Sequence, residues 1–371
     1  MKNILDVAHS LVDHVRARYS EDIALVAYYG SYAQGTATSR SDLDFFFIPA
    51  TPKGYNASIQ FVLNGISFDF WPISWERAER MAAFQEQNVS IIADCILLYV
   101  RSDEDRARFL KLRDTIADMP RQGLTLAERS EAQLREAYVH LYKMNRTGNL
   151  EDITFFRTEA HGVLTKVLYA LALLNRTYFT KGWGKNTEQI LNFQLKPARL
   201  ETLLNTIMYA QAGQEIREAC EQLTADTLEL LMKQKEAYAS APSYPDRMKG
   251  FYEEVKGILD KIVTASEKND YPSAFFWAAG AQDEIARFLY YAEKGCWPVT
   301  LDPSLAYQAI YYQAGFPNLL PLLDPGNLIP LQEAVERLDA LLKRHLLEQG
   351  VVIHSFENLT QFEEYLRNRQ E

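Results

Sequence analysis

Hydrophobic and polar positions follow two different periods along the chain, and the change from one to the other divides it near residue 120. Before that point, short apolar runs bounded by turn residues predict β-strands, and capped segments between them predict helices. The pair Asn64-Gly65 separates two of these runs and predicts a two-residue hairpin. The predicted strands are 23–29, 42–48, 58–63, 66–73 and 95–100, and the predicted helices are 4–19, 74–86 and 102–119, with a short helix after Gly30.

Helical signals dominate beyond Pro120. Thr125 and Glu128 have the spacing of a capping box, in which two side chains satisfy backbone N–H groups at a helix start, and we expect this helix to run to Arg146. A second helix is predicted over residues 152–175. Because it is apolar nearly all round, it should be the buried helix of this region.

A proline-containing stretch, SAPSYPDRMKG at 240–250, predicts a linker. Residues 251–371 continue with helical patterns but carry no motif that indicates a function. The whole pattern predicts the α+β class, with an N-terminal mixed-sheet domain followed by a large helical region. The expected domains are residues 1–122 for the mixed-sheet domain, 123–242 for a helical domain and 243–371 for a C-terminal helical domain.

The 371 residues are 47% hydrophobic and 24% charged, which is typical of a soluble globular protein. Lys and Arg total 39 against 49 Asp and Glu, and the formal charge of −10 argues against long DNA or RNA as a partner. An acidic surface attracts a cationic small molecule, although it also serves solubility alone. The sequence shows no signal peptide, no membrane span and three scattered cysteines, so we expect a cytoplasmic protein with reduced thiols and no membrane partner.

The segment YYGSYAQGTATSRSDLDFFFI at 28–48 carries the main chemical signal. Gly30 and Ser31 follow a predicted strand at a turn, where backbone N–H groups can hold a triphosphate and glycine permits its close approach. Asp42 and Asp44 then point the same way from the next predicted strand. Two like charges on one strand face repel each other, and a divalent metal ion would resolve that repulsion.

A third carboxylate, Asp69, lies between Phe68 and Phe70 in a strand that can pair beside the first two. Magnesium prefers oxygen ligands, and with Asp42 and Asp44 this residue would complete a two-metal site with ions about 3.5–4 Å apart. One ion would activate an acceptor hydroxyl and the other would hold the triphosphate. The alternative is a solvated edge strand beside an ordinary turn, against which the apolar flanks of Asp69 argue.

The order Gly-Ser, ten further residues, Asp-x-Asp and a strand Asp resembles the nucleotidyltransferase superfamily that includes DNA polymerase beta and the kanamycin and streptomycin nucleotidyltransferases. The resemblance covers about residues 20–120. It implies nucleotidyl transfer with ATP or another nucleoside triphosphate as co-substrate. It also implies a catalytic role for the three carboxylates and nucleotide binding at Gly30 and Ser31.

In small-molecule members of that superfamily an appended helical domain builds the acceptor site, and residues 126–240 are similar to it in position and helicity. The kanamycin enzyme has a helical-domain Glu as general base and a Lys that touches the nucleotide. The resemblance implies these roles for Glu136 and Lys143, although their spacing differs from that family's. Both residues lie with His140 opposite the apolar face of their predicted helix, so a solvated helix face is an equally good interpretation.

The second, apolar helix carries Glu159 and Lys166 on one stripe. Charges in such a setting need partners, which a triphosphate, a cationic acceptor or each other would provide. Past the helix, the stretch 175–185 loosely resembles the nucleotide-binding lysine region of streptomycin adenylyltransferases and offers Lys181 and Lys185. This implies Lys166 and Lys181 as phosphate ligands, while Glu159 is the alternative general base. The competing interpretation is an internal pair of Glu159 with Lys166 and an ordinary basic loop.

The sequence therefore predicts metal-dependent transfer of a nucleoside monophosphate, AMP from ATP, to a hydroxyl of a small acceptor such as a cationic aminoglycoside antibiotic. A close alternative is modification of a protein or tRNA. A second alternative, of a different class, is a regulatory protein that binds a nucleotide without turnover. Three intact carboxylates, which cost stability without a metal, favour the enzyme.

Overall fold

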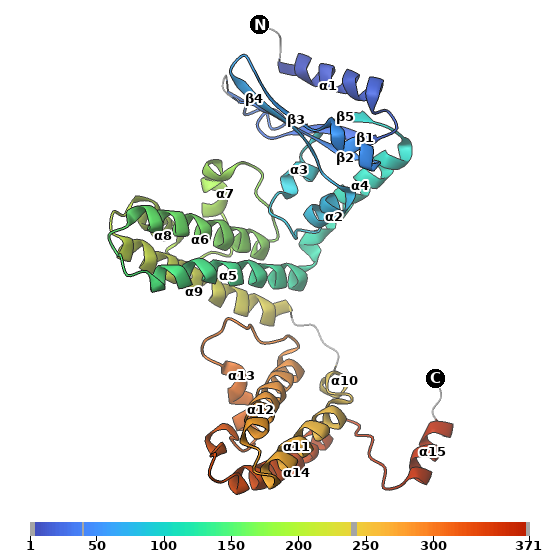
Figure 1. Ribbon diagram of the computed structural model, residues 1–371, viewed down its shortest axis with the longest axis vertical. Helices are drawn as coiled ribbons and strands as arrows, with labels where there is room; N and C mark the ends of the chain where they lie inside the picture. Colours follow the sequence, from blue (N-terminus) through green and yellow to red (C-terminus); the bar gives the residue numbers. More distant parts are fainter. Residues whose placement is uncertain (1–3, 39–40, 239–242, 369–371) are drawn as a thin grey trace. The chain divides into compact units, whose positions relative to one another are not determined.

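The computed structural model describes residues 4–38, 41–238 and 243–368. The chain forms two compact units, Met1–Lys235 and Glu236–Glu371 (Figure 1). The first unit contains the sheet together with the first group of helices, and the second unit is helical. This arrangement agrees with the predicted α+β class.

Within the described residues, the N-terminal part of the first unit is a five-stranded mixed sheet. Its strands are β1 (Ile23–Tyr29), β2 (Leu43–Pro49), β3 (Ile59–Leu63), β4 (Ile66–Pro72) and β5 (Ile96–Val100), in the spatial order β3-β4-β2-β1-β5. β2 and β4 run parallel, and the other neighbouring strands run antiparallel. Asn64 and Gly65 have φ angles of 54° and 79°, the left-handed values that a two-residue hairpin requires. Every strand begins and ends within one residue of its predicted ends.

Helices cover the two faces of this sheet differently. On one face α1 (Ile4–Arg18) packs its apolar side against the strands (Figure 1). α2 (Trp75–Ala82), α3 (Val89–Ala93) and α4 (Asp103–Asp118) lie on the other side. The core under α1 includes Ala8, Val12, Val15, Leu43, Phe45 and Phe47. Alternate residues of β2, among them Asp44, therefore face away from α1.

In the sheet part of the first unit, the sequence predicted the helix starts correctly but not the short irregular segments. Ser74 and Ser102 cap α2 and α4 as predicted, each accepting a hydrogen bond from a backbone N–H three residues on. The helix predicted after Gly30 is absent from the described residues, since Gly30 and Gly35 have φ angles of 77° and 69° and enclose only turns. The predicted helix 74–86 is too long, because Phe84 has a φ of 58° and ends it; α3 was not predicted.

The helical part of the first unit consists of α5 (Gly123–Arg146), α6 (Ile153–Leu174), α7 (Thr187–Leu191), α8 (Leu200–Tyr209) and α9 (Gly213–Tyr238). As predicted, α6 is buried, and its last eight residues are all at most 2% exposed. The capping box predicted for α5 is wrong. That helix begins at Gly123, before Thr125, with no side-chain cap at Gln122. Three-residue or longer 3-10 segments occur at Pro52–Ala57, Met119–Arg121 and Trp183–Lys185.

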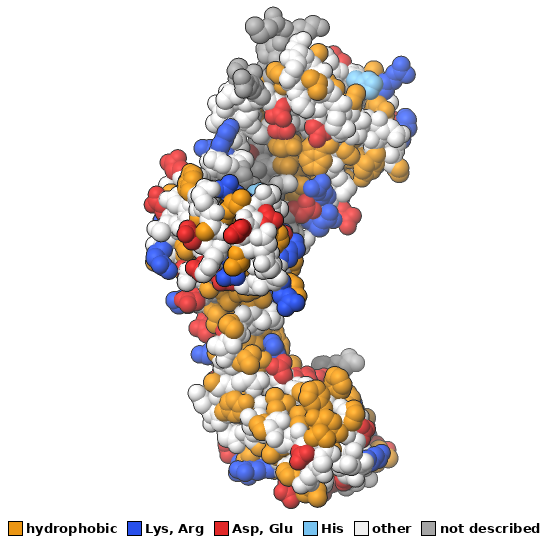
Figure 2. Space-filling view, turned by 60° about the vertical axis from the view of Figure 1, so that its left-hand side comes forward, with side chains coloured by type: hydrophobic (Ala, Val, Ile, Leu, Met, Phe, Trp, Pro, Cys, Tyr) orange, Lys and Arg blue, Asp and Glu red, His pale blue; other side chains and the backbone are white. Residues whose placement is uncertain are grey.

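The second unit contains α10 (Tyr244–Arg247), α11 (Phe251–Glu267), α12 (Tyr271–Lys294), α13 (Ala306–Gln313), α14 (Ile329–Glu348) and α15 (Leu359–Asn368), with a 3-10 turn at Leu320–Leu322. Apolar faces of α11, α12 and α14 build its core. Residues 240–242 of the predicted linker 240–250 lie outside the described ranges. Residues 243–250 do not form a linker, because Met248 is buried in that core. Figure 2 shows hydrophobic side chains gathered on one face of this unit.

None of the helices in the described ranges has the length and apolar character needed to cross a membrane. Cys95 and Cys220 are buried free thiols. Burial raises the pKa of both, to about 11 for Cys95 and about 12 for Cys220, so neither forms a reactive thiolate at neutral pH.

Candidate active site

Four polar side chains form a row across the sheet, one from each of four neighbouring strands. Asp44 of β2 is the register partner of Asp69 on β4 and of Tyr29 on β1. Asp69 is in turn the register partner of Gln60 on β3. Register partners point to the same face of a sheet, so Gln60, Asp69, Asp44 and Tyr29 share the face that α1 leaves open. We call these four residues the carboxylate row.

The turn after β1 lies against this row. A Cβ atom on Gly30 would stand only 2.6 Å from Asp44 Oδ2, so glycine alone leaves room for that carboxylate. Beyond Gly30 the chain turns tightly, with Gln34 N donating to the Gly30 carbonyl at 3.1 Å and Thr36 N to the Ser31 carbonyl at 2.9 Å. The structure thus brings the predicted Gly30-Ser31 turn and the Asp44 carboxylate together.

Asp42 and Asp69 lie close enough to Asp44 to change the pKa of its carboxyl group. Burial, and then the charges of Asp42 and Asp69, raise the pKa of Asp44 to about 6. Burial, followed by the charges of the three carboxylates, raises the pKa of the neighbouring Tyr29 to about 12. Within the ranges that the structure describes, no Lys or Arg forms an ion pair with any of the three. No described side chain therefore compensates the negative charge of this site with a positive one.

The chemistry of these donors suits a hard divalent cation, which takes oxygen ligands. No group of three or more His, Cys, Asp or Glu side chains in the described part of the chain is gathered closely enough to hold a metal ion by itself. The carboxylates offer a partial set of ligands, as magnesium usually requires, since it keeps waters and takes substrate phosphates as well. A triphosphate against the Gly30 turn could supply the remaining oxygens.

Two members of the carboxylate row were not predicted from the sequence. Gln60 Nε2 donates to Asp69 Oδ1 at 2.8 Å and fixes the orientation of that carboxylate. Trp71 Nε1 donates to the Tyr29 hydroxyl at 3.2 Å on the other side of the row. Gln60 could have been found, because counting outward from the hairpin turn pairs it directly with Asp69. Tyr29 carries no such signal, since its place depends on the pairing of β1 with β2.

The charged residues that the sequence singled out on α5 and α6 lie at the contact between these two helices. Lys166 of α6 pairs with Glu136 of α5. His140 Nδ1 lies 2.6 Å from Glu159 Oε2, and Lys143 Nζ lies 3.2 Å from Glu159 Oε1. We call these five residues the α5–α6 polar cluster. The face of α5 that carries Glu136, His140 and Lys143 is therefore turned toward α6, and Glu159 and Lys166 pair across the helices instead of with each other.

Glu159 is the buried centre of this cluster, with 8% of its surface exposed. Burial acts to raise its pKa, but the hydrogen bonds from His140 and Lys143 outweigh burial and leave the pKa below its usual value. The His140 ring also lies directly over Gly162, where a Cβ atom would stand 2.3 Å from the ring. Close approach of the two helices at that glycine keeps the cluster compact.

A loop beyond α6 connects the helical part to the turn after β1. The Gln34 side chain donates to the backbone carbonyl of Thr180. Asn186 holds the same loop closed, since its side chain bonds both the backbone N–H and the carbonyl of Lys181, at 3.2 and 2.7 Å. Lys181 therefore lies one residue from a direct contact with the turn after β1, and its side chain is exposed.

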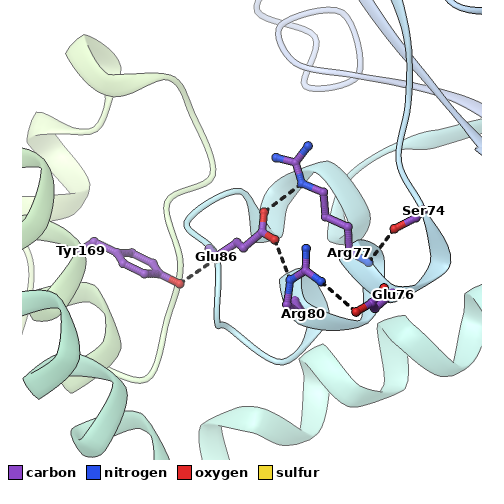
Figure 3. A network of polar contacts seen from close by, with 6 residues as sticks. All are labelled: Ser74, Glu76, Arg77, Arg80, Glu86 and Tyr169. Carbon is purple, nitrogen blue, oxygen red and sulfur yellow. Dashed lines mark hydrogen bonds and ion pairs between the residues drawn. The ribbon is translucent and has the colours of Figure 1, made fainter.

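A polar network around Glu86 joins the sheet part of the first unit to α6 (Figure 3). Glu86 accepts hydrogen bonds from Arg77 at 3.0 Å and Arg80 at 3.1 Å, and Arg80 also pairs with Glu76. The hydroxyl of Tyr169, a residue only 1% exposed, donates to the Glu86 carbonyl at 2.8 Å. Because buried hydrogen bonds are costly to break, this network fixes α6 to the segment that follows α2.

Two family models match adjoining parts of the chain. Residues 9–114 match the nucleotidyltransferase domain and residues 106–237 match the KNTase C-terminal domain. No curated protein matches the chain significantly. Among solved structures, a nucleotidyltransferase-like protein from Exiguobacterium sibiricum 255-15 is similar over 62% of this chain and 78% of that chain, with 10% identity and a TM-score of 0.38. By its two matched domains, the chain is a nucleotidyltransferase enzyme.

Proposed function

We propose that the chain transfers AMP from ATP to a hydroxyl group of a small acceptor molecule. The observation that carries this proposal is the pairing of Asp44 and Asp69 on neighbouring parallel strands beside the Gly30 turn. Two carboxylates without a cationic partner cost folding free energy, and a metal-bound triphosphate repays that cost on binding. The proposal therefore explains why the sheet tolerates them.

Each residue around the turn has a distinct part in binding the nucleotide. The backbone N–H groups at Gly30 and Ser31 hold phosphate oxygens. Lys181, from the loop attached to the turn, adds a positive charge. Asp42, Asp44 and Asp69 hold magnesium, which when bound neutralises the triphosphate and lowers the pKa of the acceptor hydroxyl.

The general base is assigned to Glu136. A base needs a free oxygen, whereas both oxygens of Glu159 are bound by His140 and Lys143, whose hydrogen bonds outweigh burial and lower its pKa. Glu136 is exposed and has Lys166 as its partner, which holds its side chain in place. Lys143 and Lys166 were expected to bind phosphate, but each is already ion-paired with a carboxylate. The proposal therefore assigns the phosphate contact to Lys181.

An aminoglycoside-like antibiotic is the first acceptor to test. The match of residues 106–237 to the KNTase C-terminal domain supports this class, and the formal charge of −10 favours a cationic acceptor. Positioning and charge neutralisation would supply most of the catalysis, as is usual for transfer of phosphorus groups.

The proposal is tested by incubating the protein with labelled ATP, magnesium and kanamycin, streptomycin, a lincosamide or cell extract. We expect pyrophosphate release that needs both magnesium and an acceptor, together with a labelled AMP adduct. Asp44→Asn should abolish the release, while Asp114→Asn, at an exposed position of α4, should leave it unchanged. Labelling of protein or tRNA from the extract would replace the small acceptor, and ATP binding without any release would favour the regulatory role.

A further inference from the structure

A pocket of about 410 Å³ lies between α6, α7 and α8 in the helical part of the first unit. Its walls are mainly aliphatic, and include Ala160, Leu164, Leu168, Ile190 and Leu204. Pockets that bind organic molecules have volumes of about 300–1,000 Å³ and apolar walls with a few polar groups. This pocket has both properties.

The polar groups of the pocket are few, and three of them have no other partner in the described chain. His161, Glu201 and Asn205 line it, and within the described chain their side chains form no hydrogen bond or ion pair. The guanidinium of Arg157, which also lines it, bonds to Gln211. The lining contains one carboxylate, Glu201, and one guanidinium, Arg157, so it has no excess negative charge. The pocket therefore suits an apolar group better than a polycation.

The pocket is close enough to the phosphate-binding turn for one molecule to reach both. Gln34, in the turn after β1, bonds the Thr180 carbonyl, and Gly184 on the same loop lines the pocket. Four residues of chain span at most about 14 Å, which limits the distance from Thr180 to the pocket wall. A drug-sized molecule has a comparable length, so its body could fill the pocket while a hydroxyl points to the turn.

We infer that this pocket is the acceptor subsite and that it takes the apolar part of a hydroxylated molecule. The inference rests on the proposed nucleotidyl transfer but departs from the aminoglycoside-like acceptor named there, because an acceptor that consists only of a polycationic sugar has no apolar part to enter the pocket. An aliphatic or aromatic substituent enters between α6 and α8, and His161, Glu201 and Asn205 bond the polar groups at the entrance.

Alkyl β-glucosides test this inference, because methyl, butyl and hexyl glucoside share their hydroxyls and differ only in apolar length. Binding is measured by calorimetry below any micelle-forming concentration. We expect the affinity to rise about three- to four-fold for each methylene that enters the pocket. Asn205→Trp should abolish this dependence by filling the entrance, and Glu201→Trp, one helical turn away, is a second blocking variant. Thr202→Trp, exposed on the same helix but outside the lining, should keep it.

Pyrophosphate release is measured in parallel with ATP, magnesium, each glucoside and kanamycin. Chain-length-dependent binding that Asn205→Trp removes supports the subsite even where no acceptor gives release, and in that case the transfer activity alone fails. The inference is overturned if the affinity does not depend on chain length. It is also overturned if both blocking variants keep the wild-type affinities and their melting temperatures match the wild type. A further outcome is that Asn205→Trp still releases pyrophosphate with kanamycin while the glucosides show no chain-length-dependent binding. That result would support the transfer activity and overturn the subsite.

Discussion

The first unit carries two groups of partly buried charges that the fold treats in opposite ways. In the α5–α6 polar cluster, Glu159 has two cationic or hydrogen-bonding partners, and its pKa lies below the usual value. In the carboxylate row, Asp44 has no such partner, and burial together with the charges of Asp69 and the nearby Asp42 raises its pKa to about 6. The two carboxylates are both desolvated, so the difference lies in their neighbours.

This difference separates a structural role from a ligand-binding one. A buried charge that serves packing is paired within the protein, since an unpaired one costs several kcal/mol at most sites. Natural proteins leave such costs in place where a ligand relieves them. Glu159 is therefore fully paired without a substrate, whereas Asp42, Asp44 and Asp69 have no cationic partner among the described residues. The predictions below change one group while using the other as its reference.

The largest expected effect is on catalysis by Asp44→Asn. Removing one metal ligand should lower the rate of nucleotidyl transfer by about 10³-fold, because metal stabilisation of the transition state is worth several kcal/mol. Steady-state pyrophosphate release at saturating magnesium measures it, with Asp114→Asn as the control. A loss of less than about tenfold would mean that the row does not hold the catalytic metal.

The next largest expected effect is that ATP stabilises the protein mainly when magnesium is present. At about 100 times its dissociation constant, ATP with magnesium should stabilise the protein by about 2.7 kcal/mol, which raises the melting temperature by several degrees. ATP with EDTA should do much less, because the metal bridges phosphates and carboxylates. Asp44→Asn should remove the magnesium-dependent part, while Glu159→Gln should keep it. Equal shifts with and without magnesium in the wild type would contradict the metal site.

The choice of general base separates the two glutamates of the polar cluster. Glu136→Gln should lower kcat by about 10²-fold with ATP affinity unchanged, since general bases contribute about that much. Glu159→Gln should affect kcat less and destabilise the fold by about 1–2 kcal/mol, because a buried carboxylate with two partners is lost. Turnover, ATP affinity and urea unfolding are measured on both variants. A catalytic collapse confined to Glu159→Gln would transfer the role to the buried helix.

The sheet could be predicted because its signals are local. Each strand is a short apolar run, and Asn64-Gly65 fixes both the hairpin and its register. The segments that were missed depend on distant contacts: Phe84 adopts a positive φ and ends α2 early, and its ring packs beside Tyr178 from beyond α6. No pattern around Phe84 reports a partner so far away along the sequence.

The candidate site was predictable to the same extent. Asp42, Asp44, Asp69 and Gly30 stand out because like charges at one place and a glycine after a strand are unusual in any fold. The partners of Glu159 could not be assigned from the sequence. Helical spacing identifies which residues lie on the same side of α6, but it does not show which side of α5 packs against them. The structure pairs Glu159 with His140 and Lys143, and only the packing of the two helices decides this.

The smallest expected effect is a pH dependence of stability that has opposite signs in the two groups. The usual pKa of an Asp is 3.8 and that of Asp44 in the folded protein is about 6, so both states bind the proton at low pH and the folded state resists ionisation as the pH rises. The metal-free wild type should therefore lose stability between about pH 4 and pH 6 from this residue. A shift of two pKa units corresponds to about 3 kcal/mol, which solvent screening of the partly exposed side chain reduces to about 1–2 kcal/mol.

Glu159 has a lowered pKa, so its contribution to stability is present above the unfolded pKa and is lost as the pH falls through the folded one. Urea unfolding in EDTA at about pH 4, 5, 6 and 7 should show the advantage of Asp44→Asn over wild type growing with pH and levelling above about 6. The stability that Glu159→Gln loses relative to wild type should grow as the pH rises from about 4 to about 5. The stability of Asp114→Asn relative to wild type should not change with pH. An Asp44→Asn advantage that does not change with pH would show that burial and the charges of Asp42 and Asp69 do not raise the pKa of Asp44 in the folded protein, and the contrast between the two groups would then have another cause.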